Sequence, residues 1–317
     1  MTVPRNAVRA IVDQVYSYAG GVARLADMYL PNAPQAPLPV VLWLHGGGWR
    51  FGDRHLAPDL ARFAEESGLA VVSIDYRLSD EAKFPAAIED TKTAVRWVRS
   101  VAAEFGLNGV RIALWGSSAG GHLAACAALS QEDEFLTDEH PGRSSKVQAV
   151  VDGYGPTNFG RIDAERPTMV TVGSDAESLG IGKVVPAGAP DSFESRFLGS
   201  AVAHSPQLVE LADPVHYVRS GNPPFLILHG ASDTLIPWSQ SKHLFDALSA
   251  AGDEAVLVLF EKLGHGFFNH RSLADEDYGT VTMHRSVRAR TERRWKWDLA
   301  AGIPSMVASF LQAHLQA

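Results

Sequence analysis

The chain has 317 residues, 46% of them hydrophobic, and a formal net charge of −8 at pH 7. This acidic balance gives no support for nucleic-acid binding, and the single cysteine, Cys126, excludes an internal disulfide. No segment has the uninterrupted apolar length that crosses a bilayer, and the N-terminal stretch lacks a basic segment followed by an apolar core. We therefore expect a cytoplasmic protein with no nucleic-acid or membrane partner.

Strand patterns come first in the chain, and helix patterns then alternate with them. Apolar and β-branched runs predict strands over residues 8–17, 22–30, 38–44, 69–76, 110–115, 147–153, 223–229 and 255–260. Amphipathic or Ala-rich runs predict helices over residues 57–67, 85–104, 119–130, 238–251 and 303–315. Early hairpins followed by this alternation predict a single α/β domain over residues 1–317, with a mostly parallel eight-stranded sheet and helices on both faces.

A glycine run follows the predicted strand 38–44 in the segment His45-Gly46-Gly47-Gly48-Trp49. Backbone N–H groups in such a run are exposed and can bind an oxyanion. The segment is therefore a candidate half of an acyl-transfer site.

The other half is Gly116-Ser117-Ser118-Ala119-Gly120, which has the form GxSxG with Ser118 at its centre. An apolar strand pattern precedes it and an Ala-rich helix pattern follows it. Strand, tight turn and helix is the order that raises a serine hydroxyl above the carboxyl end of a sheet strand. Ser118 is therefore the candidate nucleophile.

A serine hydroxyl is a poor nucleophile at neutral pH, so it requires a base and a carboxylate that orients the base. His265 lies between two glycines just past the strand 255–260 and is the candidate base. Asp233 lies on the loop after the strand 223–229 and is the favoured acid, with Glu261 as its rival. The chain order Ser118, Asp233, His265 matches the order expected for this architecture.

The remaining histidines near these motifs are assigned other roles. His229 falls inside the strand 223–229 and is predicted to be a packed residue. Structural or surface positions are predicted for His122, His243 and His270.

Six segments carry a resemblance to a known family: HGGGW at 45–49, DYRL at 75–78, FPAAIEDTKTAVRWVR at 84–99, WGSSAGGHLA at 115–124, PPFLILHGASDTLIP at 223–237 and LGHGF at 263–267. They resemble the α/β-hydrolase carboxylesterases. Within these the chain is similar to the hormone-sensitive-lipase-like esterases, and more closely to the bacterial group of feruloyl or acetyl xylan esterase-like proteins. The resemblance covers residues 25–155 and 205–267 and implies an α/β-hydrolase fold.

The resemblance also implies roles for matching residues. Ser118 would be the nucleophile, His265 the general base and then acid, and Asp233 the residue that holds the imidazole in its tautomer. The oxyanion hole would consist of the backbone N–H groups of Gly47, Gly48 and Ala119. Two residues would support the site: His45, which shapes the glycine loop, and Tyr76, which braces that loop through its hydroxyl unless it is a plain core tyrosine.

Two insertions interrupt the family pattern. Residues 155–205 are rich in Gly, Pro and Ser, with apolar islands such as Met169-Val170 and Ile181, and we expect them to form a lid or cap over the acyl pocket. Residues 268–300 carry the basic residues Arg285, Arg288, Arg290, Arg293, Arg294 and Lys296, interleaved with Trp295 and Trp297. The second insertion is open to four interpretations: a lid helix, a dimerisation helix that would make a homodimer, a basic patch for an anion, or a solvated helical face.

The sequence therefore predicts a serine hydrolase that cleaves small to medium carboxylic esters through an acyl-enzyme intermediate, with no metal or cofactor. Three alternatives stay open. One is an amidase of the arylformamidase type, which shares the two glycine-containing motifs. The others are an acyl-processing tailoring enzyme and a noncatalytic small-molecule receptor. The choice of ester cannot be read from the motifs.

Overall fold

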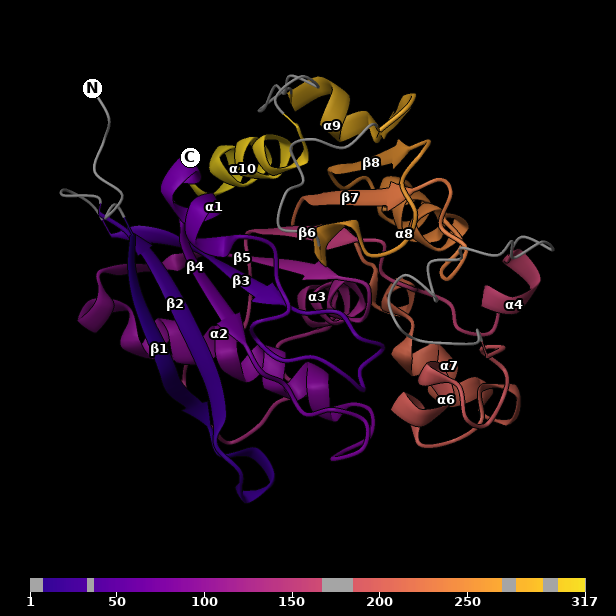
Figure 1. The fold of residues 1–317 in the computed structure, drawn as a ribbon, viewed down its shortest axis with the longest axis horizontal. Helices are drawn as coiled ribbons and strands as arrows, with labels where there is room; N and C mark the ends of the chain where they lie inside the picture. The colour runs from indigo at the N-terminus through magenta and orange to yellow at the C-terminus, as the bar shows by residue number, and fades with distance from the viewer. Residues whose placement is uncertain (1–7, 33–36, 167–184, 270–277, 293–301, 317) are drawn as a thin grey trace.

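The computed structural model describes residues 8–32, 37–166, 185–269, 278–292 and 302–316. Its centre is a nine-stranded sheet in the order β1-β2-β4-β3-β5-β6-β7-β8-β9 (Figure 1). The strands are β1 Val8–Ser17, β2 Arg24–Pro31, β3 Leu38–Leu44, β4 Ala70–Ile74, β5 Leu107–Ser117, β6 Ala149–Gly153, β7 Phe225–Gly230, β8 Ala255–Phe260 and β9 Val281–Arg285.

The middle of the sheet, from β4 through β8, is parallel, while the strands at its two ends are antiparallel. Eight strands match the predicted ones closely, and the fold is the expected α/β-hydrolase type. The predicted count of eight was wrong, because β9 pairs with β8 inside the insertion 268–300. Its five residues lie at the sheet edge and none is fully buried, so the segment lacks the apolar run that marked the central strands.

Helices cover both faces of the sheet (Figure 1). The described α-helices are α1 Leu60–Ser67, α2 Ala86–Phe105, α3 Ala119–Leu129, α4 Ile162–Glu165, α6 Phe193–Leu198, α7 Pro206–Ala212, α8 Ser239–Ala250, α9 Val287–Glu292 and α10 Gly302–Leu315. Short 3₁₀ helices are η1 Ala19–Gly21, η2 Val202–His204, η3 Pro214–Tyr217 and η4 Phe267–Asn269. None of these described helices has the length and apolar character required to span a membrane.

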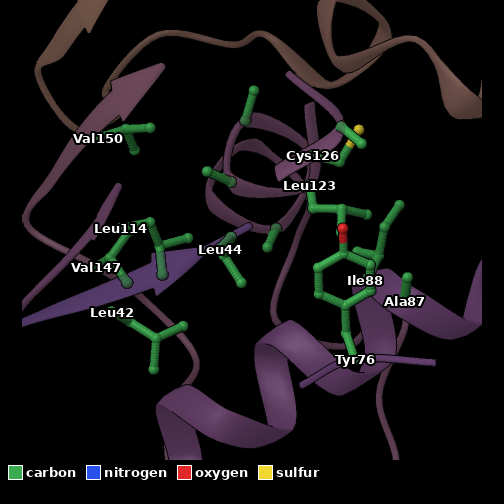
Figure 2. Close-up of a cluster of buried hydrophobic side chains, with 14 of the residues drawn as sticks. Leu42, Leu44, Tyr76, Ala87, Ile88, Leu114, Leu123, Cys126, Val147 and Val150 are labelled. Atoms are coloured by element: carbon green, nitrogen blue, oxygen red, sulfur yellow. The ribbon is translucent and has the colours of Figure 1, made fainter. Parts of the chain in front are cut away.

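The two apolar faces of the sheet follow from alternation along its strands. In β3, Leu42 and Leu44 belong to the cluster that packs against α2, α3 and α8, whereas Trp43 belongs to the cluster that packs against α1 and α10. Figure 2 shows the first cluster, in which Leu42 and Leu44 lie with Ile88 of α2 and Leu123 of α3. This double burial explains why the central strands read as continuous apolar runs.

The two insertions differ in placement. The described part of 155–205 contains α4, α6 and η2, and in Figure 1 it lies beyond the carboxyl ends of the central strands. The apolar islands Met169-Val170 and Ile181 lie outside the described residues. In the other insertion, β9 and α9 pack against β8, and residues 293–297 also lie outside the described part.

Candidate active site

Ser118 occupies a strained turn between β5 and α3. Its backbone has φ 54° and ψ −117°, a conformation that non-glycine residues rarely adopt. A Cβ atom at Gly116 would lie 2.1 Å from the carbonyl oxygen of Gly120, and one at Gly120 would lie 2.0 Å from that of Leu44. The glycines on either side of the serine therefore allow the turn to pack directly against its neighbours.

The loops after β7 and β8 bring the predicted acid and base to this serine. The Nε2 atom of His265 lies 2.8 Å from Oγ of Ser118, although 147 residues separate them in sequence. The Nδ1 atom of His265 lies 2.6 Å from Oδ2 of Asp233. Because a carboxylate only accepts, Nδ1 carries the proton and Nε2 is left to accept from the serine hydroxyl.

Asp233 is held in its ionised form by a full set of donors. Its Oδ1 atom accepts the backbone N–H groups of Leu235 at 2.9 Å and Ile236 at 2.8 Å. Burial alone would raise the pKa of Asp233, but the facing imidazoles of His265 and His229 hold that pKa well below its usual value. The carboxylate thus remains negative beside His265.

His229 is buried, as the sequence predicts, but it also contacts the acid. Its Nε2 atom lies 3.1 Å from Oδ2 of Asp233, the same oxygen that receives the proton of His265. The strand pattern indicated burial only. The signal that could have found this contact is the spacing, because His229 ends a strand four residues before an acid on the following turn.

The glycine loop faces the nucleophile from the end of β3. Gly47 and Gly48 line the same cavity as Ser118, Ala119 and His265. Within the described residues, the N–H groups of Gly47, Gly48 and Ala119 donate no hydrogen bond, and Ala119 opens helix α3, where N–H groups have no partner in the helix. These three groups are available as donors to an oxygen in the cavity.

His45 and Tyr76 lie behind the glycine loop. The Tyr76 hydroxyl donates to the carbonyl of His45 at 2.8 Å, and the two rings stack with centroids 4.2 Å apart. His45 is buried, and this burial lowers its pKa to about 4, so the ring is neutral at pH 7. Tyr76 thus contacts the first residue of the glycine loop, and His45 is not part of the hydrogen-bonded chain from Ser118 to Asp233.

Tyr154, just after β6, is a second residue that the sequence analysis missed. Its ring packs edge-to-face on His265 with centroids 4.8 Å apart, and its hydroxyl accepts the N–H of Phe268 at 3.0 Å. Tyr154 has a positive φ of 46°. No pattern in the sequence distinguishes this tyrosine from an ordinary core residue.

The other candidates lie in different surroundings. Glu261 accepts the N–H of Thr280, at the start of the turn into β9, so it is not the acid that His265 contacts. His122 is buried on α3 with Nε2 at 2.7 Å from the carbonyl of Ala212, and His243 pairs with Glu165. His270 lies outside the described residues.

A cavity of about 510 Å³ opens above Ser118. One wall comes from the sheet side and the other from the insertion 155–205. Its lining residues are Gly47, Gly48, Trp49, Arg50, Phe51, Leu56, Ser118, Ala119, Pro156, Arg166, Val185, Asp191, Ser192, Phe193, Glu194, Arg196, Leu235, Ile236, His265 and Asn269. The arrangement combines an activated hydroxyl with oriented N–H donors in a partly enclosed, mostly apolar pocket, which suits acyl transfer.

Comparison with known proteins identifies a matching family and relatives of this chain. The BD-FAE family model matches residues 26–248. Esterase LipC of Mycobacterium tuberculosis is 32% identical over 256 residues, covering 79% of this chain and 58% of LipC. The chain spans about half the length of the curated relatives it matches.

Solved structures give the same assignment. A truncated carbohydrate esterase from gut microbiota superposes with a TM-score of 0.66 at 26% identity, covering 82% of this chain and 90% of that one. Esterase Est2 of Thermogutta terrifontis, with propionate bound, gives a TM-score of 0.63 at 26% identity, covering 84% and 87%. The match of the family model over most of the chain, together with these relatives, shows that the chain belongs to the BD-FAE family of α/β-hydrolase carboxylesterases.

Proposed function

We propose that the protein is a serine carboxylesterase that hydrolyses small to medium carboxylic esters. One observation carries the proposal: a continuous hydrogen-bonded chain runs from Ser118 through His265 to Asp233, at 2.8 Å and 2.6 Å, and opens into a cavity. This is the arrangement by which a weak hydroxyl nucleophile is activated.

In the acylation step, Nε2 of His265 takes the proton of Ser118 as Oγ attacks the ester carbonyl. The carbonyl oxygen becomes negative and accepts hydrogen bonds from the N–H groups of Gly47, Gly48 and Ala119. Each such donor typically lowers a barrier by roughly 3 kcal/mol. The imidazolium of His265, stabilised by ionised Asp233, then protonates the leaving alcohol as the carbon–oxygen bond breaks.

In the deacylation step, His265 accepts a proton from water, and the resulting hydroxide attacks the acyl-enzyme carbonyl. The second tetrahedral intermediate uses the same N–H donors. Its collapse releases the carboxylic acid and returns the proton to Oγ of Ser118. Every proton in this cycle moves through Nε2 of His265, and Nδ1 keeps its proton throughout.

The cavity and the relatives support the proposed substrate class. A space of about 510 Å³ lies within the range of small-molecule pockets, which favours small to medium esters. The insertion 155–205 supplies one wall of it, in keeping with a cap that shapes specificity. Est2 has been solved with propionate and in a form phosphonylated by sarin, which supports a short acyl group and a reactive serine here too.

The proposal is tested with a fluorophosphonate probe and an ester panel. We expect the probe to label the wild type and to leave Ser118→Ala unlabelled. We also expect the wild type to cleave 4-nitrophenyl acetate and butyrate faster than N-formylkynurenine. An unlabelled wild type would favour a noncatalytic binder, and preferred turnover of N-formylkynurenine would favour an amidase. Feruloyl and acetylated-sugar esters in the same panel identify the preferred alcohol and acyl groups.

Two further expectations stay predictions. A homodimer would be detected by light scattering of the purified protein. A cytoplasmic location would be detected by fractionation of the source cells.

A further inference from the structure

His229 and Ser241 form a second imidazole–hydroxyl pair on the far side of Asp233. The Nε2 atom of His229 lies 3.1 Å from Oδ2 of Asp233 and 3.0 Å from the carbonyl oxygen of Ile236. Its Nδ1 atom lies 2.7 Å from Oγ of Ser241, the third residue of α8. Both side chains are buried, with 0% exposure of each residue.

These contacts determine where the proton of His229 lies. The carbonyl of Ile236 and the carboxylate of Asp233 can only accept, so Nε2 must carry the hydrogen. In the tautomer with the hydrogen on Nε2, Nδ1 presents a lone pair that accepts the hydroxyl proton of Ser241. Ile236 and Asp233 therefore fix Nε2 as the donor toward the acid, and Ser241 holds the opposite side of the ring.

The shared oxygen connects this pair to the reaction. Oδ2 of Asp233 accepts hydrogen bonds from Nδ1 of His265 on one side and from Nε2 of His229 on the other. Oδ1 accepts hydrogen bonds from two backbone N–H groups. A displacement of Oδ2 would be transmitted directly to Nδ1 of His265. Since catalytic groups must be held close to their productive geometry, a donor that fixes this oxygen affects the rate.

We infer that His229 is a positioning residue for the catalytic acid, and that Ser241 positions His229. The inference rests on the proposed reaction at Ser118 and names two residues that support it without touching the substrate.

Two other polar residues, Asp152 and Tyr154, lie near His229. Asp152 lies close enough to interact electrostatically with His229, and the ring of Tyr154 lies 6.3 Å away from it. Burial raises the pKa of Asp152 to about 6. Any pH readout at this site must therefore be compared between variants that leave Asp152 and Tyr154 unchanged.

The decisive experiment compares His229→Gln with His229→Met in the 317-residue chain. The glutamine amide can place an N–H near the position of Nε2, whereas methionine has a similar volume and no donor. We expect His229→Met to lower kcat for 4-nitrophenyl acetate by roughly 10- to 100-fold with KM nearly unchanged. We expect His229→Gln to restore most of this loss, and Ser241→Ala to fall between the two.

A pH profile of kcat/KM distinguishes a positioning role of His229 from a general loss of fold stability. Without the donor from His229, Oδ2 of Asp233 becomes more basic and stabilises the imidazolium of His265 more strongly. The acidic limb of kcat/KM should therefore move to higher pH in His229→Met and stay in place in His229→Gln.

A buried histidine remote from the cavity provides the matched control. His314 on α10 is 5% exposed, and its Nδ1 atom contacts the carbonyl of Phe310. His314→Met should lower the melting temperature but leave kcat and the pH profile unchanged.

The inference would be overturned if His229→Met kept kcat within threefold of the wild type. It would also be overturned if His229→Gln and His229→Met lost activity equally, or if the acidic limb did not move. Failure of the proposed function would give a different result: the wild type itself would show neither fluorophosphonate labelling nor ester turnover.

Discussion

The hydroxyl groups of Tyr154 and Ser117 are 2.8 Å apart and join the segment after β6 to the residue that precedes the nucleophile. The same Tyr154 hydroxyl accepts the N–H of Phe268 on the loop that carries His265. One buried oxygen therefore connects the serine turn to the histidine loop, two segments whose relative position sets the distance between Oγ and Nε2.

Tyr154→Phe removes this oxygen and keeps the ring that packs on His265. The N–H of Phe268 would lose its partner in a buried site, which typically costs about 1–3 kcal/mol of stability. We expect kcat to fall several-fold with little change in KM, because the histidine loop is less well fixed relative to Ser118. Steady-state kinetics and urea unfolding measure the two effects.

Tyr217→Phe is the control for this prediction. The Tyr217 hydroxyl donates to the carbonyl of Leu211 at 2.7 Å, in a segment that does not line the cavity. Its removal should reduce stability without lowering kcat. If both variants lowered kcat equally, the special role of the Tyr154 hydroxyl would be rejected.

Gly48 and Phe193 form one of the contacts between the glycine loop and the insertion 155–205. Gly48 has a φ of 59°, and a Cβ atom on it would lie 2.7 Å from the Phe193 ring. Gly48→Ala should therefore displace the loop N–H groups and lower kcat/KM by roughly 10- to 100-fold. Phe193→Ala removes the two ring atoms at 2.7 Å and 2.8 Å and leaves Cβ at 3.2 Å, so the same substitution should cost less in that background.

Gly47 provides the contrast. A Cβ atom there would lie 2.2 Å from the backbone carbonyl oxygen of Phe51, which a change at Phe193 cannot move. Gly47→Ala should lose activity equally in both backgrounds. A double-mutant cycle on kcat/KM measures the difference, and an unchanged cost of Gly48→Ala in the Phe193→Ala background would contradict the proposed steric coupling.

The assignment of Asp233, rather than Glu261, as the catalytic acid can be tested by mutation. Asp233→Asn should lower kcat by roughly 10³- to 10⁴-fold, because the amide no longer stabilises the imidazolium or fixes the tautomer of His265. Glu261→Gln should remain close to the wild type, since the Glu261 carboxylate contacts the turn into β9. Similar losses in the two variants would mean that the acid has been misassigned.

Much of this site could be predicted because its main residues obey rules that are local in sequence. Ser118 stands between a strand and a helix pattern, and Asp233 and His265 each follow a strand. Carboxyl ends of parallel strands meet at one edge of a sheet, so three separate loops could be expected to converge. The two-sided burial of the central strands likewise appears as uninterrupted apolar runs.

The missed features depend on contacts that no local pattern encodes. His229 looks like any strand residue until β7, the Asp233 turn and α8 are placed together. Tyr154 gains its role only when the β5, β6 and β8 loops meet. Strand β9 is short and paired on one side, and its two apolar residues, Val281 and Met283, are only partly buried, so its formation depends largely on the edge of β8.

Asp152, the fourth residue of β6, offers a prediction about stability and pH. Its Oδ1 atom accepts the N–H of Gly155 at 3.0 Å, whereas Oδ2 is buried and has no partner among the described residues. Burial raises the pKa of Asp152 to about 6. The unfolded chain ionises this group near its ordinary value of about 4, so between about pH 4 and pH 6 the folded state binds more protons than the unfolded state.

The contribution of Asp152 to the unfolding free energy must therefore fall as the pH rises through that range, and stay low above it. Asp152→Asn keeps an acceptor for Gly155 and removes the ionisation. It should change stability little at about pH 4 and increase it by up to about 3 kcal/mol at about pH 8, since each pKa unit corresponds to about 1.4 kcal/mol. Urea unfolding at the two pH values measures the difference.

Asp246→Asn, at an exposed carboxylate of α8 paired with Lys242, is the matched control and should change stability by less than about 0.5 kcal/mol at either pH. If Asp152→Asn increased the unfolding free energy equally at the two pH values, the cause would be improved packing and not relief of a buried charge. A loss at about pH 8 would show that the ionised Asp152 carboxylate stabilises the fold, since only the ionised form is present well above a pKa of about 6.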